Sequence, residues 1–159
     1  YNMKTLLFKL STLLLATLFF SCSSEAIIEE NENNMNTSME TEILLLINTH
    51  RTSLNLKKLE TLAVIKTQTN SHTKYMIKKG KISHDNFNQR ANYLQANAKA
   101  TSTSENIASG YSSAKSVVKG WLNSTGHRKN IEGNYTHFNI TAAQNNKGIW
   151  YHTNIFMYQ

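Results

Sequence analysis

Apolar side chains recur every three or four positions through much of this chain, which is the spacing of amphipathic helices. The pattern predicts a first helix that begins near Ser38–Glu40 and ends near Leu54. Three further helices are predicted over residues 61–79, 86–98 and 113–126. Gly80 is expected to end the second of them, because glycine readily takes the left-handed conformation that closes a helix. The polar residues 99–104 are expected to form a loop.

The pattern changes to strict alternation in the last third of the chain. Phe138, Ile140 and Ala142 alternate with polar side chains, which predicts a half-buried strand. Residues 145–148 have the composition of a turn, and residues 149–158 are rich in aromatic and β-branched side chains. A second strand and a closing hairpin are therefore predicted. Helices that precede a hairpin indicate an α+β fold, with a small antiparallel sheet covered by helices.

The first 22 residues have the features of an export signal. Lys4 and Lys9 precede an apolar run over residues 10–20, which is shorter than the roughly 20 residues of a membrane span. Ser21-Cys22 follows this run at once and resembles the lipobox of bacterial lipoproteins. We therefore predict an exported protein of the bacterial cell envelope, anchored to a membrane through lipid on Cys22. Plain secretion, with an incidental cysteine, is the alternative.

Composition divides the rest of the chain into two parts. Residues 23–40 carry five glutamates and no basic side chain, so they are expected to form an acidic flexible tether before one domain over residues 41–159. That domain carries 15 Lys and Arg side chains against 5 Asp and Glu, a formal charge of +10. The basic side chains are scattered and the protein is predicted to be exported, so no nucleic-acid partner is expected. The charge favours anionic lipid or glycan surfaces, or serves only solubility. The single cysteine excludes an internal disulfide framework.

Three segments place a polar, ligand-capable side chain at the end of an apolar element. His84 follows the second predicted helix, Glu105 opens a predicted strand, and His127 follows the fourth helix. Such positions are where a rigid scaffold presents functional groups. Two imidazoles and a carboxylate are ligands that zinc accepts, but separations of 21 and 22 residues form no local metal motif. From spacing alone, structural histidines are therefore the stronger interpretation.

The same segments, in this order, resemble the CAP superfamily (cysteine-rich secretory proteins, antigen 5 and pathogenesis-related 1), in its disulfide-free bacterial branch. The most specific piece is Trp121–Ile131, which matches the pattern W-x-x-S-x-G-H-R-x-N-I at every fixed position. Ser104–Ala108 resembles G-E-N-I-A, with serine in place of glycine, and Leu46–Arg51 resembles L-I-N-x-x-R. The resemblance covers about residues 41–159.

The resemblance implies an α-β-α sandwich whose cleft holds His84, Glu105 and His127. Many eukaryotic members have a second acid where this chain has Ser124, so one carboxylate of the family's set is absent. Some members hold zinc or another divalent cation through the two histidines, which makes His84 and His127 the candidate metal ligands. Glu105 is the candidate catalytic carboxylate, with a purely bracing role equally open. Ser124 is expected to cap or brace a helix end.

Two function classes follow from this set of residues. The first is an extracytoplasmic binding or interaction module whose cleft takes a lipid, peptide or glycan, with any metal shaping the site. The second is a metal-assisted hydrolase, peptidase or esterase-like, in which His84 and His127 hold the ion and Glu105 activates its water. The absent second acid favours the binding module. His72 is expected to be a core or cleft-rim residue, and Asp85 is expected to cap the third helix.

Overall fold

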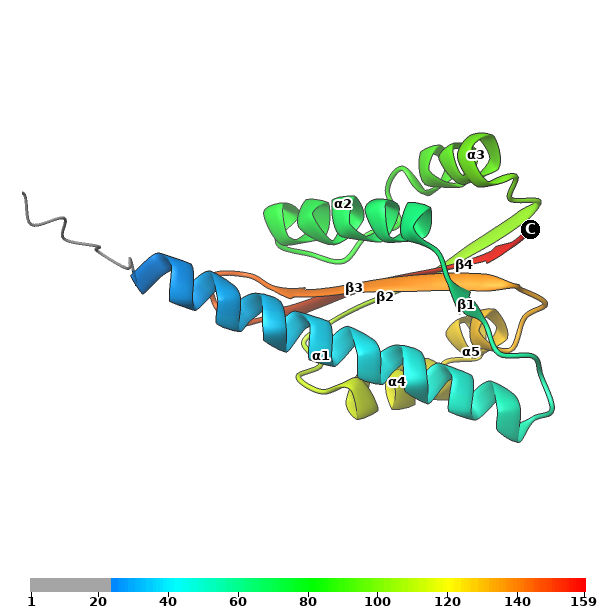
Figure 1. The fold of residues 1–159 in the computed structure, drawn as a ribbon, viewed down its shortest axis with the longest axis horizontal. Helices are drawn as coiled ribbons and strands as arrows, with labels where there is room; N and C mark the ends of the chain where they lie inside the picture. Colours follow the sequence, from blue (N-terminus) through cyan, green and yellow to red (C-terminus); the bar gives the residue numbers. More distant parts are fainter. Residues whose placement is uncertain (1–23) are drawn as a thin grey trace, which may run out of the picture.

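A computed structural model describes residues 24–159 as a four-stranded sheet between two layers of helices (Figure 1). The predicted export signal and Cys22 lie outside the described residues, so the lipid anchor stays a prediction. In chain order the elements are α1 Ser24–Ser53, β1 Glu60–Thr61, α2 Ala63–Lys79, α3 Phe87–Ala98, β2 Ser102–Ser109, α4 Ala114–Asn123, α5 Thr125–Ile131, β3 His137–Gln144 and β4 Trp150–Tyr158.

The sheet has the order β1-β3-β4-β2, which places β4 in its interior and β2 at one edge. β4 runs antiparallel to both β3 and β2, whereas the two-residue β1 pairs in parallel with β3. The β3–β4 hairpin confirms the strand pair predicted from the alternating pattern. β4 is buried along almost its whole length, as expected for an interior strand covered on both faces.

Alternate residues of the strands face different helix layers. Phe156 packs among side chains of α1, α4 and α5 on one face. Its neighbours Ile155 and Met157 pack on the other face with Ile65 of α2 and Leu94 of α3. Figure 1 shows the same division, with α2 and α3 on one side of the sheet and α1, α4 and α5 on the other. The expected α-β-α sandwich of the α+β class is therefore confirmed.

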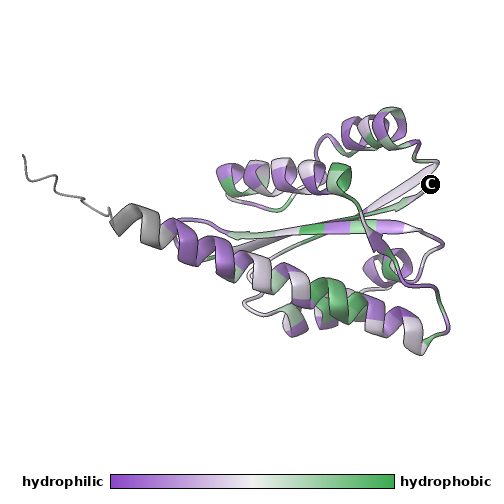
Figure 2. Cartoon of the chain, viewed as in Figure 1, coloured by the Kyte–Doolittle hydropathy of each residue, from purple (hydrophilic) through white to green (hydrophobic). Residues whose placement is uncertain are grey.

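α1 begins at Ser24, well before the predicted start near Ser38–Glu40. The acidic segment expected to be a flexible tether, residues 23–40, is thus helical from Ser24 onwards: it contains no glycine or proline, so nothing in its sequence ends the helix. Its side chains from Glu29 to Ser38 are almost all exposed, and Figure 2 shows this polar stretch projecting beyond the sheet. Its role as a connection to a membrane stays a prediction. Within residues 24–159, no helix is both long and apolar enough to cross a membrane.

The packed part of α1 is joined to the rest of the domain near Glu40. Glu40 accepts a hydrogen bond from the backbone nitrogen of Ala142 at 3.0 Å and another from the amine of Lys66 at 2.6 Å. Met39, one residue earlier, is buried in the same core as Ile43. These contacts tie the start of the packed part of α1 to both β3 and α2.

α2 matches its prediction closely. It ends at Lys79, and Gly80 follows it with a φ of 72°, the left-handed conformation expected at a helix end. Its predicted stripe is buried, since Ile65, Thr69 and Met76 are inaccessible to solvent. The apolar spacing of three and four therefore identified the correct face.

Two other predicted boundaries are wrong. The fourth helix ends at Asn123 rather than Gly126, because Ser124 takes an extended conformation and starts the separate helix α5. Strand β2 begins at Ser102, within residues that were expected to form a loop. Its polar side chains concealed the strand, which forms because its backbone pairs with β4 from Ser102 opposite Tyr158 onwards.

Candidate functional site

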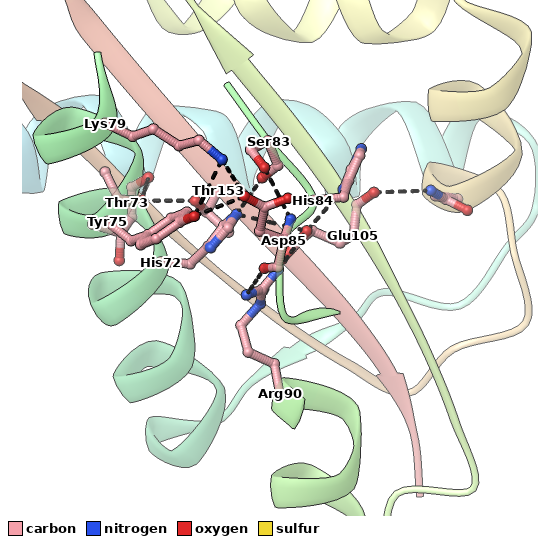
Figure 3. Close-up of polar contacts among 12 residues, drawn as sticks. His72, Thr73, Tyr75, Lys79, Ser83, His84, Asp85, Arg90, Glu105 and Thr153 are labelled. Carbon is pink, nitrogen blue, oxygen red and sulfur yellow. Dashed lines mark hydrogen bonds and ion pairs between the residues drawn. The ribbon is translucent and has the colours of Figure 1, made fainter. Parts of the chain in front are cut away.

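Glu105 on β2 is the centre of a buried polar network (Figure 3). Its carboxylate accepts two hydrogen bonds from the guanidinium of Arg90 on α3, from Nε to Oε2 and from Nη2 to Oε1, each at 2.8 Å. His84 Nδ1 lies 2.8 Å from the same Oε1. The Glu105 side chain is 1% exposed, so the groups that bond to its two oxygens come from the protein. The carboxylate is therefore held on both oxygens.

His84 is the exposed member of this network, with 54% of its side chain accessible to solvent. Because a carboxylate oxygen accepts the bond to Nδ1, that nitrogen carries the proton, and Nε2 of the neutral ring is left as an acceptor. Figure 3 shows the ring extending away from Glu105, with Nδ1 toward the carboxylate. Glu105 thus fixes the orientation and the tautomer of an accessible imidazole.

The short segment that carries His84, between α2 and α3, is fastened at two neighbouring residues. His72 Nε2 donates a hydrogen bond to the carbonyl oxygen of Ser83 at 2.7 Å. The carbonyl oxygen of Asp85 accepts one from Arg90 Nη1 at 2.8 Å. Since both flanking residues are tied to helices, the position of His84 is set by the scaffold.

The Asp85 side chain adds a third attachment, on the outside of this segment. Its carboxylate pairs with the Lys79 amine and accepts a hydrogen bond from the hydroxyl of Tyr75 at 2.7 Å. Lys79 first, and then Tyr75 and Ser83, hold the pKa of Asp85 well below its usual range. The predicted capping role is wrong, because Asn86 occupies the cap position of α3 and no side-chain hydrogen bond is made there.

His72 is a buried positioning residue. It is 2% exposed, and burial lowers its pKa, which keeps it neutral and able to donate through Nε2. Its Nε2 also lies 3.9 Å from Glu105 Oε1, and its ring stacks on Tyr75 with centroids 5.8 Å apart. The expectation of a satisfied core or rim histidine is confirmed.

The residue after Glu105 holds the second histidine segment. Asn106 faces the opposite side of β2, where its Nδ2 donates to the carbonyl oxygen of His127 at 3.0 Å. Asn130 Nδ2 donates to Asn106 Oδ1 at 2.8 Å and thereby fixes the same helix, α5. Two adjacent residues of an edge strand therefore position the two histidine-bearing segments, one from each helix layer.

His127 itself is half-buried. Burial lowers its pKa, and the nearby His84 lowers it further by charge repulsion, so the two rings lie close enough to influence each other. Ser124 does not join the network: it starts α5, but its side chain makes no capping hydrogen bond, contrary to the expected bracing role. The structure thus brings His84, Glu105 and His127 to one edge of the sheet.

Arg90 is the residue of this network that the sequence interpretation missed. It lies three residues after Phe87 and four before Leu94, on the predicted apolar face of the third helix. A charged side chain on a buried face needs a partner, and that was the signal. The identity of the partner depends on how α3 packs on β2, which spacing along the chain does not give.

A cavity of about 310 Å³ lies beside the network, between α2 and α3. Two of its walls are the buried His72 and Arg90, which both face Glu105. The rest of the lining is made of amides, a hydroxyl and phenols: Gln68, Ser71, Tyr75, Asn86, Gln89 and Tyr93. In the part of the chain that the structure describes, no three His, Cys, Asp or Glu side chains are grouped so that they could hold a metal ion.

Comparison with known proteins identifies relatives of this fold. Residues 44–156 match the model of the cysteine-rich secretory protein family, CAP. A segment of 47 residues is 47% identical to the uncharacterized protein YkwD of Bacillus subtilis; it is 29% of this chain and 18% of that relative's length. The match therefore covers under a fifth of the relative.

Solved structures agree on the architecture. An extracellular protein with an SCP domain from Bacillus anthracis is 26% identical, with a TM-score of 0.68 over 82% of this chain and 43% of that one. An outer surface protein of Borrelia burgdorferi is 21% identical, with a TM-score of 0.66 over 73% of this chain and 89% of that one. A cysteine-rich secretory protein of Staphylococcus aureus is 15% identical, with a TM-score of 0.64 over 78% and 39%.

Proposed function

Since this chain belongs to the cysteine-rich secretory protein (CAP) family, we propose that it is an exported module that binds a polar ligand at the His84 edge of its sheet. The predicted export signal supports the location, as do relatives that are described as extracellular or outer surface proteins. Lipid on Cys22 would hold the module at a membrane of the bacterial envelope, with α1 as its connection, whose stretch from Glu29 to Ser38 is almost all exposed.

One observation favours binding over hydrolysis: both oxygens of Glu105 are bonded to Arg90. A carboxylate that activates water needs an oxygen within hydrogen-bond reach of that water. Here one oxygen is shared by Arg90 and His84, and the other is held by Arg90 in the interior. Glu105 is thus suited to orienting His84 rather than to taking a proton.

The cavity between α2 and α3 indicates the class of ligand. Its amide and hydroxyl side chains offer hydrogen bonds in both directions, and Tyr75 and Tyr93 offer flat aromatic faces. The guanidinium of Arg90 at its wall is neutralised by Glu105. A neutral ligand with many hydroxyls, such as a glycan segment, fits this lining better than a lipid chain. The ligand would lie over the cavity and reach the acceptor Nε2 of His84.

The donor set does not fit a tightly held metal. Zinc sites in proteins use three or four protein ligands. His84 Nε2 and the His127 ring are two, and Glu105, which would be the third, is bonded to Arg90. The contact between His84 Nδ1 and a carboxylate is the arrangement that metal-bound histidines usually have, so we expect weak, reversible binding of a divalent cation through the two rings.

The proposal is tested by NMR titration of the protein with chitotetraose, a soluble neutral oligosaccharide. We expect shifts in the side-chain signals of Gln68, Gln89 and His84, and at least a fivefold loss of affinity in Gln89→Ala. The control is Gln95→Ala, a glutamine of the same helix that does not line this cavity. Shifts only with peptide probes would reject the glycan assignment.

Hydrolysis is measured in the same preparations. We expect no cleavage of the oligosaccharide, of casein or of p-nitrophenyl acetate above the rate in buffer, with or without added zinc. Cleavage that is lost in both His84→Ala and Glu105→Gln, while the variants keep the native NMR spectrum, would establish the hydrolase instead.

A further inference from the structure

We infer that the chain has a second binding site, for an organic carboxylate, beyond the C-terminal end of α5. A cavity of about 380 Å³ lies there, between the end of α1, the segment that follows α5 and the last residue of β4. Its lining includes Arg51, Lys57, Tyr135 and Tyr158. None of these side chains belongs to the His84–Glu105 network, so the inference does not depend on the proposed function.

Arg51 is the central observation. The residue is 2% exposed, yet its guanidinium bonds only to neutral backbone oxygens. Nε donates to the carbonyl of Lys57 at 2.9 Å, and Nη1 donates to the carbonyls of Ile131 and Gly133 at 2.7 and 2.8 Å. Across residues 29–159, no carboxylate lies within ion-pair distance of it.

A buried guanidinium without an anion is costly, because the ion loses its hydration without gaining a partner of opposite charge. Burial lowers the pKa of Arg51, and no acidic side chain of the described chain opposes that effect. The carbonyls at the end of α5 compensate part of the charge through their partial negative charge. The rest of the positive charge would be compensated by the carboxylate of a ligand in the cavity.

The geometry leaves two donors for such a ligand. A guanidinium has five N–H groups, and three of those of Arg51 are used on the backbone. Nη2 makes no hydrogen bond to the described residues. It is not one of their buried unpaired atoms, so it remains accessible to solvent. Because Arg51 lines the cavity, the N–H groups of Nη2 can reach an oxygen placed there.

The rest of the lining suits an anion with an organic body. Lys57 adds a second positive charge, and Leu56 with the rings of Tyr135 and Tyr158 provides apolar surface. The acid on this wall, Glu132, is already bonded to His50 at 2.9 Å. The volume lies in the range of small-molecule sites rather than that of a single inorganic ion.

The test compares two compounds that differ only in charge. The full chain is titrated with N-acetyl-L-phenylalanine and with its uncharged amide, and binding is followed through the backbone NMR signals of Gly133 and Asn134. We expect the acid to shift these signals and to bind at least tenfold more tightly than the amide. Arg51→Met should abolish the difference.

Because Arg51→Met also removes three structural hydrogen bonds, a second variant keeps the test decisive. Lys57→Met should weaken binding of the acid several-fold, whereas Lys58→Met, the exposed neighbour that does not line this cavity, should leave it unchanged. Equal affinity for acid and amide, or equal effects of Lys57→Met and Lys58→Met, would overturn the inference. Displacement of the acid by equimolar inorganic phosphate would also overturn it, because it would indicate a simple anion site.

Discussion

Arg90 on α3 donates two hydrogen bonds of 2.8 Å to the carboxylate of Glu105 on β2, and neither side chain is more than 8% exposed. The pair joins a helix of one layer to the edge strand of the sheet. Because one of the same oxygens is bonded to His84, the pair also orients the accessible imidazole. Structural support and site geometry therefore depend on a single buried ion pair.

Replacing only one partner of this ion pair should leave the other side chain as a buried charge without a partner. In Arg90→Met the Glu105 carboxylate is left buried without its cation, so we expect the free energy of unfolding to fall by about 3–5 kcal/mol. Glu105→Leu should cost a similar amount. The double variant should lose clearly less than the two single losses together, because no uncompensated charge remains. Urea denaturation of the three variants measures this, and additive losses would show that the pair is not coupled.

His72 is expected to hold the His84 segment through one hydrogen bond. His72→Phe keeps a ring of similar size but leaves the Ser83 carbonyl without its donor, which should cost about 1–3 kcal/mol. The amide of Phe87, which donates to the carbonyl of His84, should then exchange its hydrogen faster. Hydrogen-exchange NMR checks this. His50→Phe, in a partly exposed pair with Glu132, is the control and should leave Phe87 unchanged.

The helices and the hairpin were predictable because their burial follows from local spacing. Ile65, Thr69 and Met76 repeat along one face of α2, so the period alone identifies the side that packs on the sheet. Strand β2 was partly missed because its first residues are polar, and its pairing with β4 is a long-range property. The break at Ser124 was missed because a single extended residue leaves the apolar pattern unchanged.

The convergence of His84, Glu105 and His127 at one edge of the sheet was predictable only through the resemblance to a family. Spacing along the chain gave no reason to bring His84 near His127, and their approach depends on β2 lying at the edge of the sheet. The contact between Arg90 and Glu105 depends on the register of α3 against that strand. A charge on a predicted apolar face signals that a partner exists, but it does not say which one.

Two glycines with open space around them, Gly80 and Gly126, differ in whether an alanine there would be strained in its backbone. Gly80 has a φ of 72°, and a Cβ there would meet nothing within 4 Å, so Gly80→Ala should cost about 1–2 kcal/mol through strain alone. Gly126 lies within α5, also has open space around it, and does not have positive φ. Gly126→Ala should therefore leave stability unchanged or raise it by up to about 1 kcal/mol. Thermal unfolding compares them, and equal effects would contradict this interpretation.

The domain should become less stable as the pH is lowered, because of His152 on β4. The residue is fully buried, and its ring lies between those of Trp150 and Trp121. Burial lowers its pKa to about 4, from 6.5. Between these two values the unfolded chain binds a proton that the folded chain excludes. The free energy of unfolding should therefore decrease by about 3 kcal/mol as the pH falls through this window.

His152→Phe tests this directly, because phenylalanine keeps an aromatic ring between the two tryptophans and cannot bind a proton. Urea denaturation at pH values from 7 to 4 should show a much flatter dependence for this variant than for the wild type. Some slope should persist, since burial also lowers the pKa of His72 and of His127. His137→Phe, the same substitution on a half-buried ring at the start of β3, is the matched control, and its slope is compared with that of His152→Phe. Equal slopes for His152→Phe and the wild type would mean that the pKa of His152 is not lowered in the folded state.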